Sequence, residues 1–96
     1  MITYEIPNYV YEALANKILN SIKGTYFNTK VEVVDEDVEI VFSVSAFIYT
    51  KREIAEDYDI EKITDIVPVW WECHTYLHNK EIINNVSFNV LKNFLL

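Results

Sequence analysis

The chain has 96 residues, of which 51% are hydrophobic and 15% aromatic, and its formal net charge is −7. A chain of this length folds as one domain, residues 1–96, and can build a core without a disulfide or a metal. Nucleic-acid binding needs a stripe of basic residues that displaces phosphate counterions. An anionic membrane surface likewise attracts positively charged segments. We therefore expect neither a nucleic acid nor a membrane as a partner.

Cysteine content and the first residues indicate the compartment. Cys73 is the only cysteine, so no intrachain disulfide can form, which fits a reducing cytoplasm. Residues 1–5 lack the basic and apolar segments of a signal peptide. The longest apolar run, residues 66–71, is much shorter than the about 20 residues of a membrane span. Frequent Asn, Ile and Lys residues suggest an AT-rich, bacterial genome.

A helix is the first clear element. Pro7 suits a first helical turn, because its missing N–H would have no partner there. Apolar residues then recur at every fourth position, at Val10, Leu14 and Ile18. Gly24 ends the pattern, so we predict an amphipathic helix over residues 7–23. Residues 2–5 before it form a short strand or an extended lead-in.

Two strands follow. Residues 25–34 are rich in Thr, Tyr, Phe and Val, and residues 35–37 have the composition of a turn. Residues 38–50 alternate strictly, with apolar side chains at every even position, which predicts that the even positions face the core. The close turn makes the two strands antiparallel. At roughly 3.3 Å per residue the second strand is long for a small domain, so we expect a bend or bulge in it.

The next segment interrupts the alternation. Residues 51–61 are charged, and we interpret them as an exposed connector. Residues 62–78 return to alternation and predict a third strand, although Asp65 falls on its apolar face. Pro68 cannot donate to a strand ladder and commonly marks a bulge. We therefore predict an irregularity near Val67–Pro68 that shifts the register and turns Asp65 outward.

The chain closes with a turn, a short strand and a helix. Residues 78–80 form the turn and residues 81–84 the strand, and Ser87 is the N-cap of a helix over residues 87–95. The predicted fold class is α+β: a two-layer sandwich in which a mainly antiparallel meander of three to four strands is flanked by N- and C-terminal helices. The element order is α-β-β-β-β-α.

The segment from Trp70 to His74 carries the candidate chemistry. In a strand, neighbouring side chains lie on opposite faces, so Trp71 and Cys73 belong to the core and Cys73 cannot pair with His74. The opposite set lies on the outer face: Trp70, Glu72, His74 and Tyr76.

A small enzyme or ligand binder centred on Glu72 and His74 is one hypothesis, because a carboxylate that orients a histidine is a recurring catalytic device. This hypothesis predicts a pocket beside Trp70 and a perturbed pKa of His74. Ser43 and Ser45 are nucleophile candidates only by default, and oxyanion donors are missing.

Cofactor and metal sites are not indicated. On a strand, His74 and His78 lie roughly 13 Å apart, too far for one ion. The acidic residues between positions 53 and 61 lack the ordered spacing and the glycine of a calcium loop. We expect no cofactor and no metal.

The favoured hypothesis is a non-catalytic protein-interaction or self-associating module, with a protein partner or a homodimer. Phe47 and Tyr49 join Trp70 and Tyr76 on the predicted outer face, among small polar residues as in protein interfaces. All of the net negative charge lies in residues 35–65, which favours a basic partner. Two alternatives would remove this face: helices on both sides of the sheet, or a connector folded over it.

Overall fold

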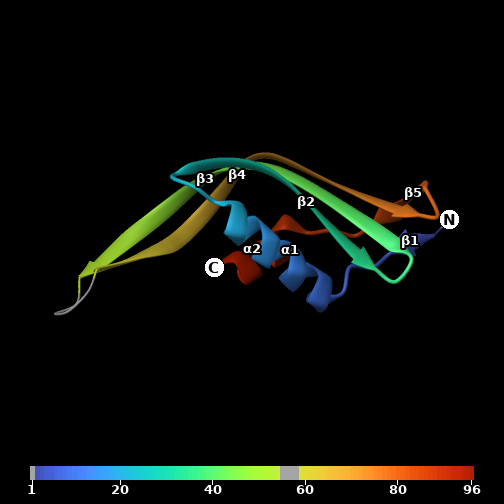
Figure 1. The fold of residues 1–96 in the computed structure, drawn as a ribbon, viewed down its shortest axis with the longest axis horizontal. Helices are drawn as coiled ribbons and strands as arrows, with labels where there is room; N and C mark the ends of the chain where they lie inside the picture. Colours follow the sequence, from blue (N-terminus) through green and yellow to red (C-terminus); the bar gives the residue numbers. More distant parts are fainter. Residues whose placement is uncertain (1, 55–58) are drawn as a thin grey trace.

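The computed structural model describes residues 2–54 and 59–96, which form a two-layer α+β fold (Figure 1). The elements are β1 (Thr3–Tyr4), α1 (Asn8–Ser21), β2 (Tyr26–Asp35), β3 (Val38–Ile54), β4 (Asp59–Leu77), β5 (Lys80–Asn84) and α2 (Phe88–Leu95). The strands make one sheet in the order β1-β5-β4-β3-β2, antiparallel except for β1 with β5. The predicted fold class and element order are confirmed, and β1 is the short strand allowed for residues 2–5. Within the described residues, no helix has the length and apolarity needed to cross a membrane.

Both helices start and stop close to the predicted signals. The Pro7 carbonyl oxygen accepts from the backbone N–H of Val10 and Tyr11, and Gly24 takes a φ of +77° after α1 has ended. Ser87 caps α2 by accepting from the backbone N–H of Val90. The first helix is slightly shorter than predicted, and its buried side chains are Val10, Tyr11, Leu14, Ala15 and Ile18.

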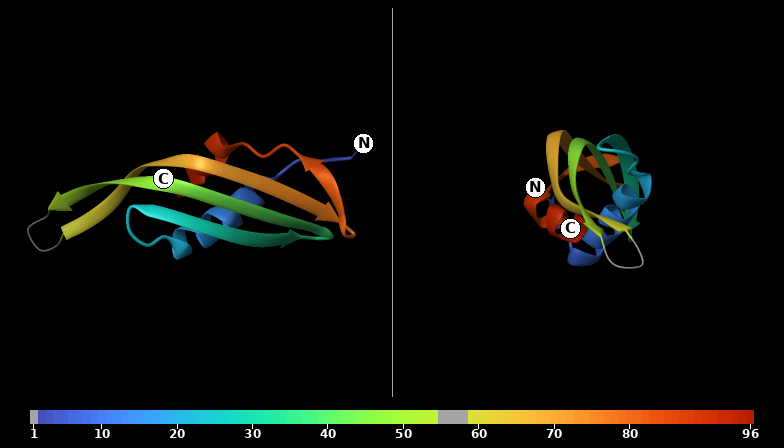
Figure 2. Two further views of the ribbon diagram at one scale, coloured as in Figure 1. Left: turned by 90° about the horizontal axis from the view of Figure 1, so that it is seen from above. Right: turned by 90° about the vertical axis from the view of Figure 1, so that its left-hand side faces the viewer.

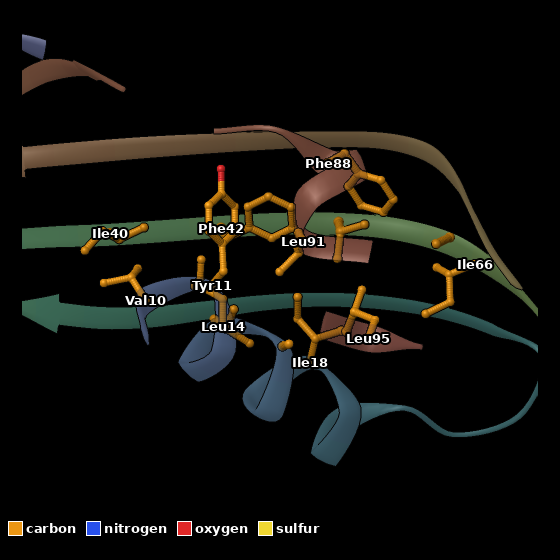
Figure 3. Packing of buried hydrophobic residues seen from close by; sticks show 14 of the residues in the cluster. Val10, Tyr11, Leu14, Ile18, Ile40, Phe42, Ile66, Phe88, Leu91 and Leu95 are labelled. Carbon is orange, nitrogen blue, oxygen red and sulfur yellow. The ribbon is translucent and has the colours of Figure 1, made fainter. Parts of the chain in front are cut away.

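The core lies between the sheet and the two helices, which cover the same face of the sheet (Figures 1 and 2). Even-numbered residues of β3 point into this layer, as the alternation predicts. Phe42 lies at its centre, and its ring stacks against those of Phe88 and Trp71 at centroid distances of 6.5 and 6.0 Å. Figure 3 shows apolar side chains from α1 and α2 meeting those of the sheet here. Phe42 therefore links the two layers.

A hydrogen-bonded carboxylate ties the N-terminal segment to the end of β2. Asp35 accepts from the hydroxyl groups of Tyr4 and Tyr9. These two bonds, that of Tyr4 first, hold the pKa of Asp35 below its usual range because they stabilise the charged form. Burial and the same carboxylate raise the pKa of Tyr4. The cluster fixes β1 and the start of α1 against the sheet.

The predicted bulge in the third strand is present. Ser45 pairs with Trp70, whereas the next residue, Ala46, pairs with Pro68. Val69 is therefore the extra residue, one position beyond the predicted Val67–Pro68, and the proline has no N–H to lose from the ladder. The bulge bends the β3–β4 ribbon over the helices, which allows so long a strand in a small domain.

A second register shift lies next to Asp65. Thr64 is the extra residue, and its hydroxyl donates to the carbonyl oxygen of Tyr49 at 3.1 Å. The bulge at Val69 places Asp65 across from the exposed Tyr49 and so out of the apolar row, as predicted, but at this edge of β4 its side chain stays within reach of α2. Its carboxylate accepts from Lys92 of α2 and from the backbone N–H of Ile66. Asp65, which breaks the apolar pattern of the sequence, therefore contributes an ion pair between β4 and α2.

The prediction of a connector over residues 51–61 is wrong for most of that segment. Residues 51–54 still belong to β3 and residues 59–61 to β4, and pairs such as Arg52 with Glu61 continue the ladder. Residues 55–58 lie outside the described part of the chain. Ladder hydrogen bonds join backbone groups, so a hairpin continues past the point where side-chain alternation ends. The result is an arm that extends beyond the helices (Figure 1).

Phe42 offers the most direct test of the core. We expect Phe42→Ala to lower the free energy of unfolding by about 3–5 kcal/mol, because it removes a fully buried ring and leaves a cavity between the layers. Val34→Ala is the control, since Val34 is 71% exposed on the same sheet and should change stability by less than about 0.5 kcal/mol. Urea unfolding measures both changes. Equal losses in the two variants would contradict this packing.

Candidate functional site

The face of the sheet turned away from both helices, here called the outer face, collects the candidate site residues. Because even-numbered residues of β3 point into the core, odd-numbered ones from 39 to 49 point outward. Pairing with β4 then fixes their neighbours: Val41 with His74, Ser43 with Glu72, Ser45 with Trp70, and Phe47 with Val67. The alternative with one helix on each face is wrong, since α1 and α2 share the other side (Figure 2).

One half of the outer face is aromatic and exposed. Phe47, Tyr49 and Trp70 are 48%, 55% and 43% exposed, and all three had been assigned to this face from the sequence. Tyr26 of β2 pairs across from Phe47, with ring centroids 5.0 Å apart. Val67 is also exposed beside them. We call these five residues the aromatic half.

The other half of the outer face is acidic. Its carboxylates come from four strands, and they are Glu32, Glu39, Glu72 and Glu81. The basic residue among them is Lys30, across from Ser43. Tyr76, the remaining candidate residue, lies between Glu39 and Glu81 and is half-buried. We call this region the acidic half.

His74 connects two of these carboxylates. Its Nε2 lies 2.7 Å from Glu72 Oε2, and its Nδ1 lies 3.0 Å from Glu81 Oε2. The bond to Glu81, and then that to Glu72, raises the pKa of His74 above its ordinary value of 6.5. The Tyr76 ring stacks on the imidazole, with centroids 6.5 Å apart. The ring therefore clamps β4 to β5, and because each of its nitrogens is engaged by a carboxylate, neither is free to face a substrate.

Cys73 and Trp71 lie on the opposite side, as the alternation predicts, but Trp71 is 36% exposed, so its assignment to the core is wrong. Burial raises the pKa of the Cys73 thiol to about 11, which keeps it protonated at neutral pH. Trp71 stacks against Phe88 of α2 at a centroid distance of 6.0 Å. Neither side chain joins the chemistry of the outer face.

The hydroxyl groups of the outer face differ in access. Ser45 is 1% exposed, and its Oγ has no hydrogen-bond partner among the described residues. It lies across from Trp70. Ser43 is half-buried across from Glu72. A substrate would have to displace side chains to reach Ser45, so a nucleophilic role would need a rearrangement of this face.

A pocket in the described part of the chain lies away from Trp70. It encloses about 240 Å³ at the base of the arm, on the helix side. Its lining is Ile22, Gly24, Thr25, Ile48, Thr50, Glu61 and Ile63. Of the two features expected for an enzyme or ligand binder, the perturbed pKa of His74 is present, and the pocket lies elsewhere. Within the described ranges, no three His, Cys, Asp or Glu side chains converge as a metal site requires.

Two contributors to this face were missed by the sequence analysis. Tyr26 and Glu81 lie on strands that were predicted, but their partners depend on the register of each hairpin. The tight turn at His78 and Asn79, both with positive φ, fixes Glu81 across from Tyr76. Counting back from that turn could have placed Glu81 near His74.

Comparison of the chain with protein-family models, with curated proteins and with solved structures gave no match. The role of the outer face is therefore argued from its geometry and charges.

The clamp predicts a pH-dependent contribution to stability. The folded-state pKa of His74 is raised, so the contribution is complete below the unfolded value of 6.5 and is lost as the pH rises through the folded pKa. We expect an NMR titration of the His74 ring to give a raised pKa in the wild type. The value should fall towards 6.5 in the variant Glu72→Gln/Glu81→Gln, and an unchanged value would contradict the clamp.

Proposed function

We propose that the protein is a non-catalytic interaction module of the cytoplasm, which binds a protein partner through its outer face. The observation that carries the proposal is the aromatic half, an exposed cluster on a sheet face that neither of the two described helices covers. Large exposed apolar patches on small domains mark interaction sites. Aromatic residues also dominate the binding energy of protein interfaces.

The acidic half indicates the chemistry of the partner. Glu32 and Glu39 make no ion pair within the described residues, and the whole chain carries a charge of −7. A partner with an apolar patch flanked by Lys or Arg residues would complement both halves at once. Such an interface forms quickly and weakens as the salt concentration rises, because long-range attraction accelerates the encounter. A second copy would bring its own carboxylates to this face, so a basic partner fits better.

Binding accounts for the outer face better than catalysis does. The His74 ring has both nitrogens engaged, the Cys73 thiol lies on the other side, and Ser45 is covered. A reaction needs a nucleophile or base that can reach a bound substrate. Binding through an aromatic surface requires only a partner with a complementary surface. The same residues that were candidates for an enzyme therefore serve the interaction hypothesis without rearrangement.

Removal of two aromatic side chains tests the proposal. We expect Phe47→Ala/Trp70→Ala to weaken partner binding by at least about tenfold, because large aromatic anchors are typical hot spots. Immobilised wild type and variant are exposed to a lysate of the source cells at low and high salt. A protein that the wild type retains, and that salt releases, is then purified and titrated against both by calorimetry.

The control is Val90→Ala, which truncates an exposed apolar residue of α2 on the opposite layer. It should bind as the wild type does. Circular dichroism confirms that each variant is folded, which is expected because both aromatic side chains are exposed. Equal affinity of the wild type and the double variant for every retained protein would contradict the proposal.

A further inference from the structure

The two edges of the sheet differ in how well they are protected from another strand. β1 forms one edge and is only two residues long, and β4 pairs with β5 only through Thr75–Leu77. The rest of the β4 edge contains Pro68 and the bulge at Val69, two devices that block strand addition. β2 forms the other edge with ten residues, no proline and an unbroken register against β3. Of the two edges along the body of the fold, outside the arm, the β2 edge is therefore the open one.

The open edge presents backbone groups in a regular row. The Thr25 carbonyl oxygen accepts from the backbone N–H of Ile48, so odd-numbered residues along β2 direct their backbone groups towards β3. Even-numbered residues direct theirs away from the sheet, and these are Tyr26, Asn28, Lys30, Glu32 and Val34. Within the described chain, no hydrogen bond from another element reaches those groups.

The side chains along this edge are self-complementary in one register. We propose that β2 pairs antiparallel with β2 of a second copy, about a two-fold axis through Val31. Lys30 then lies across from Glu32 of the second copy, and the same contact recurs on the other side of the axis. A shift by two residues in either direction places two lysines or two glutamates across from each other, which is unfavourable. A shift by one residue turns the outer side chains towards the helix layer.

This pairing provides a continuous sheet across the dimer. The pairs of Lys30 with Glu32 and of Asn28 with Val34 would exchange about eight backbone hydrogen bonds. Val34, an apolar residue that is 71% exposed, gains a neighbour. Both outer faces lie on the same side of the joined sheet, with Tyr26 of each copy close to the junction. The dimer engages Lys30 and Glu32 at the border of the acidic half, leaves Phe47, Tyr49 and Trp70 uncovered, and would present the aromatic half twice.

Charge reversal tests the pairing and its register. We measure the dissociation constant of the dimer by sedimentation equilibrium for the wild type, Lys30→Glu, Glu32→Lys and the double reversal. Each single reversal creates two like-charged pairs and should weaken the dimer by at least about tenfold, whereas the double reversal should restore it. Lys80→Glu on β5 makes the same charge change as Lys30→Glu away from the edge and should leave the dimer intact.

Asn28→Pro gives a second test that does not depend on charge. It removes one outward N–H that β2 does not use in its own ladder, so the fold should persist by circular dichroism while the dimer weakens. An 11.3 kDa monomer at about 1 mM wild type would overturn the proposal. A dimer unaffected by the edge variants would also overturn it. A dimer lost only in Phe47→Ala/Trp70→Ala would assign self-association to the outer face instead.

Discussion

The packing of both helices against one face of β3 is the constraint on which the rest of the structure depends. Phe42, Leu14 and Leu91 are fully buried between the layers, and they come from the sheet, α1 and α2 in turn. A strand that buries its even-numbered side chains must direct its odd-numbered ones the other way. The chain has no further described helix to cover them. The aromatic and acidic halves are therefore exposed because the core lies on the opposite face of the sheet.

Local patterns in the sequence were sufficient for most of the fold. The four-residue repeat of α1, the strict alternation of β3 and the cap at Ser87 each act over a few residues, and each was confirmed. The irregularity near Pro68 could be predicted because a proline and a misplaced Asp65 demanded the same register shift.

Features that depend on pairing between distant residues could not be predicted in this way. The contact of His74 with Glu81 and that of Tyr26 with Phe47 require the register of two hairpins, which is set by turn geometry. The arm was missed because backbone pairing, and not side-chain alternation, continues the strands beyond Thr50. The pocket at the base of the arm depends on where that ribbon leaves the body of the fold, a property of the whole sheet.

The outer face and the β2 edge give this small domain two adjoining surfaces, which meet at Lys30 and Glu32. The clamp of His74 between Glu72 and Glu81 holds β5 to β4 and keeps the acidic half in place. The aromatic half lies on the paired strands β2, β3 and β4 and is already exposed to a partner. Edge pairing through β2 would leave this face uncovered, so the two interactions are compatible.

The exposure of the outer face can be tested directly by its accessibility to solvent. NMR relaxation measured with a soluble gadolinium probe reports which side chains solvent can reach. We expect strong relaxation enhancement for Phe47, Tyr49 and Trp70 and little for Phe42 and Leu14. Equal protection of the two groups in the isolated protein would show that the sheet is covered on both faces, and would contradict an exposed outer face.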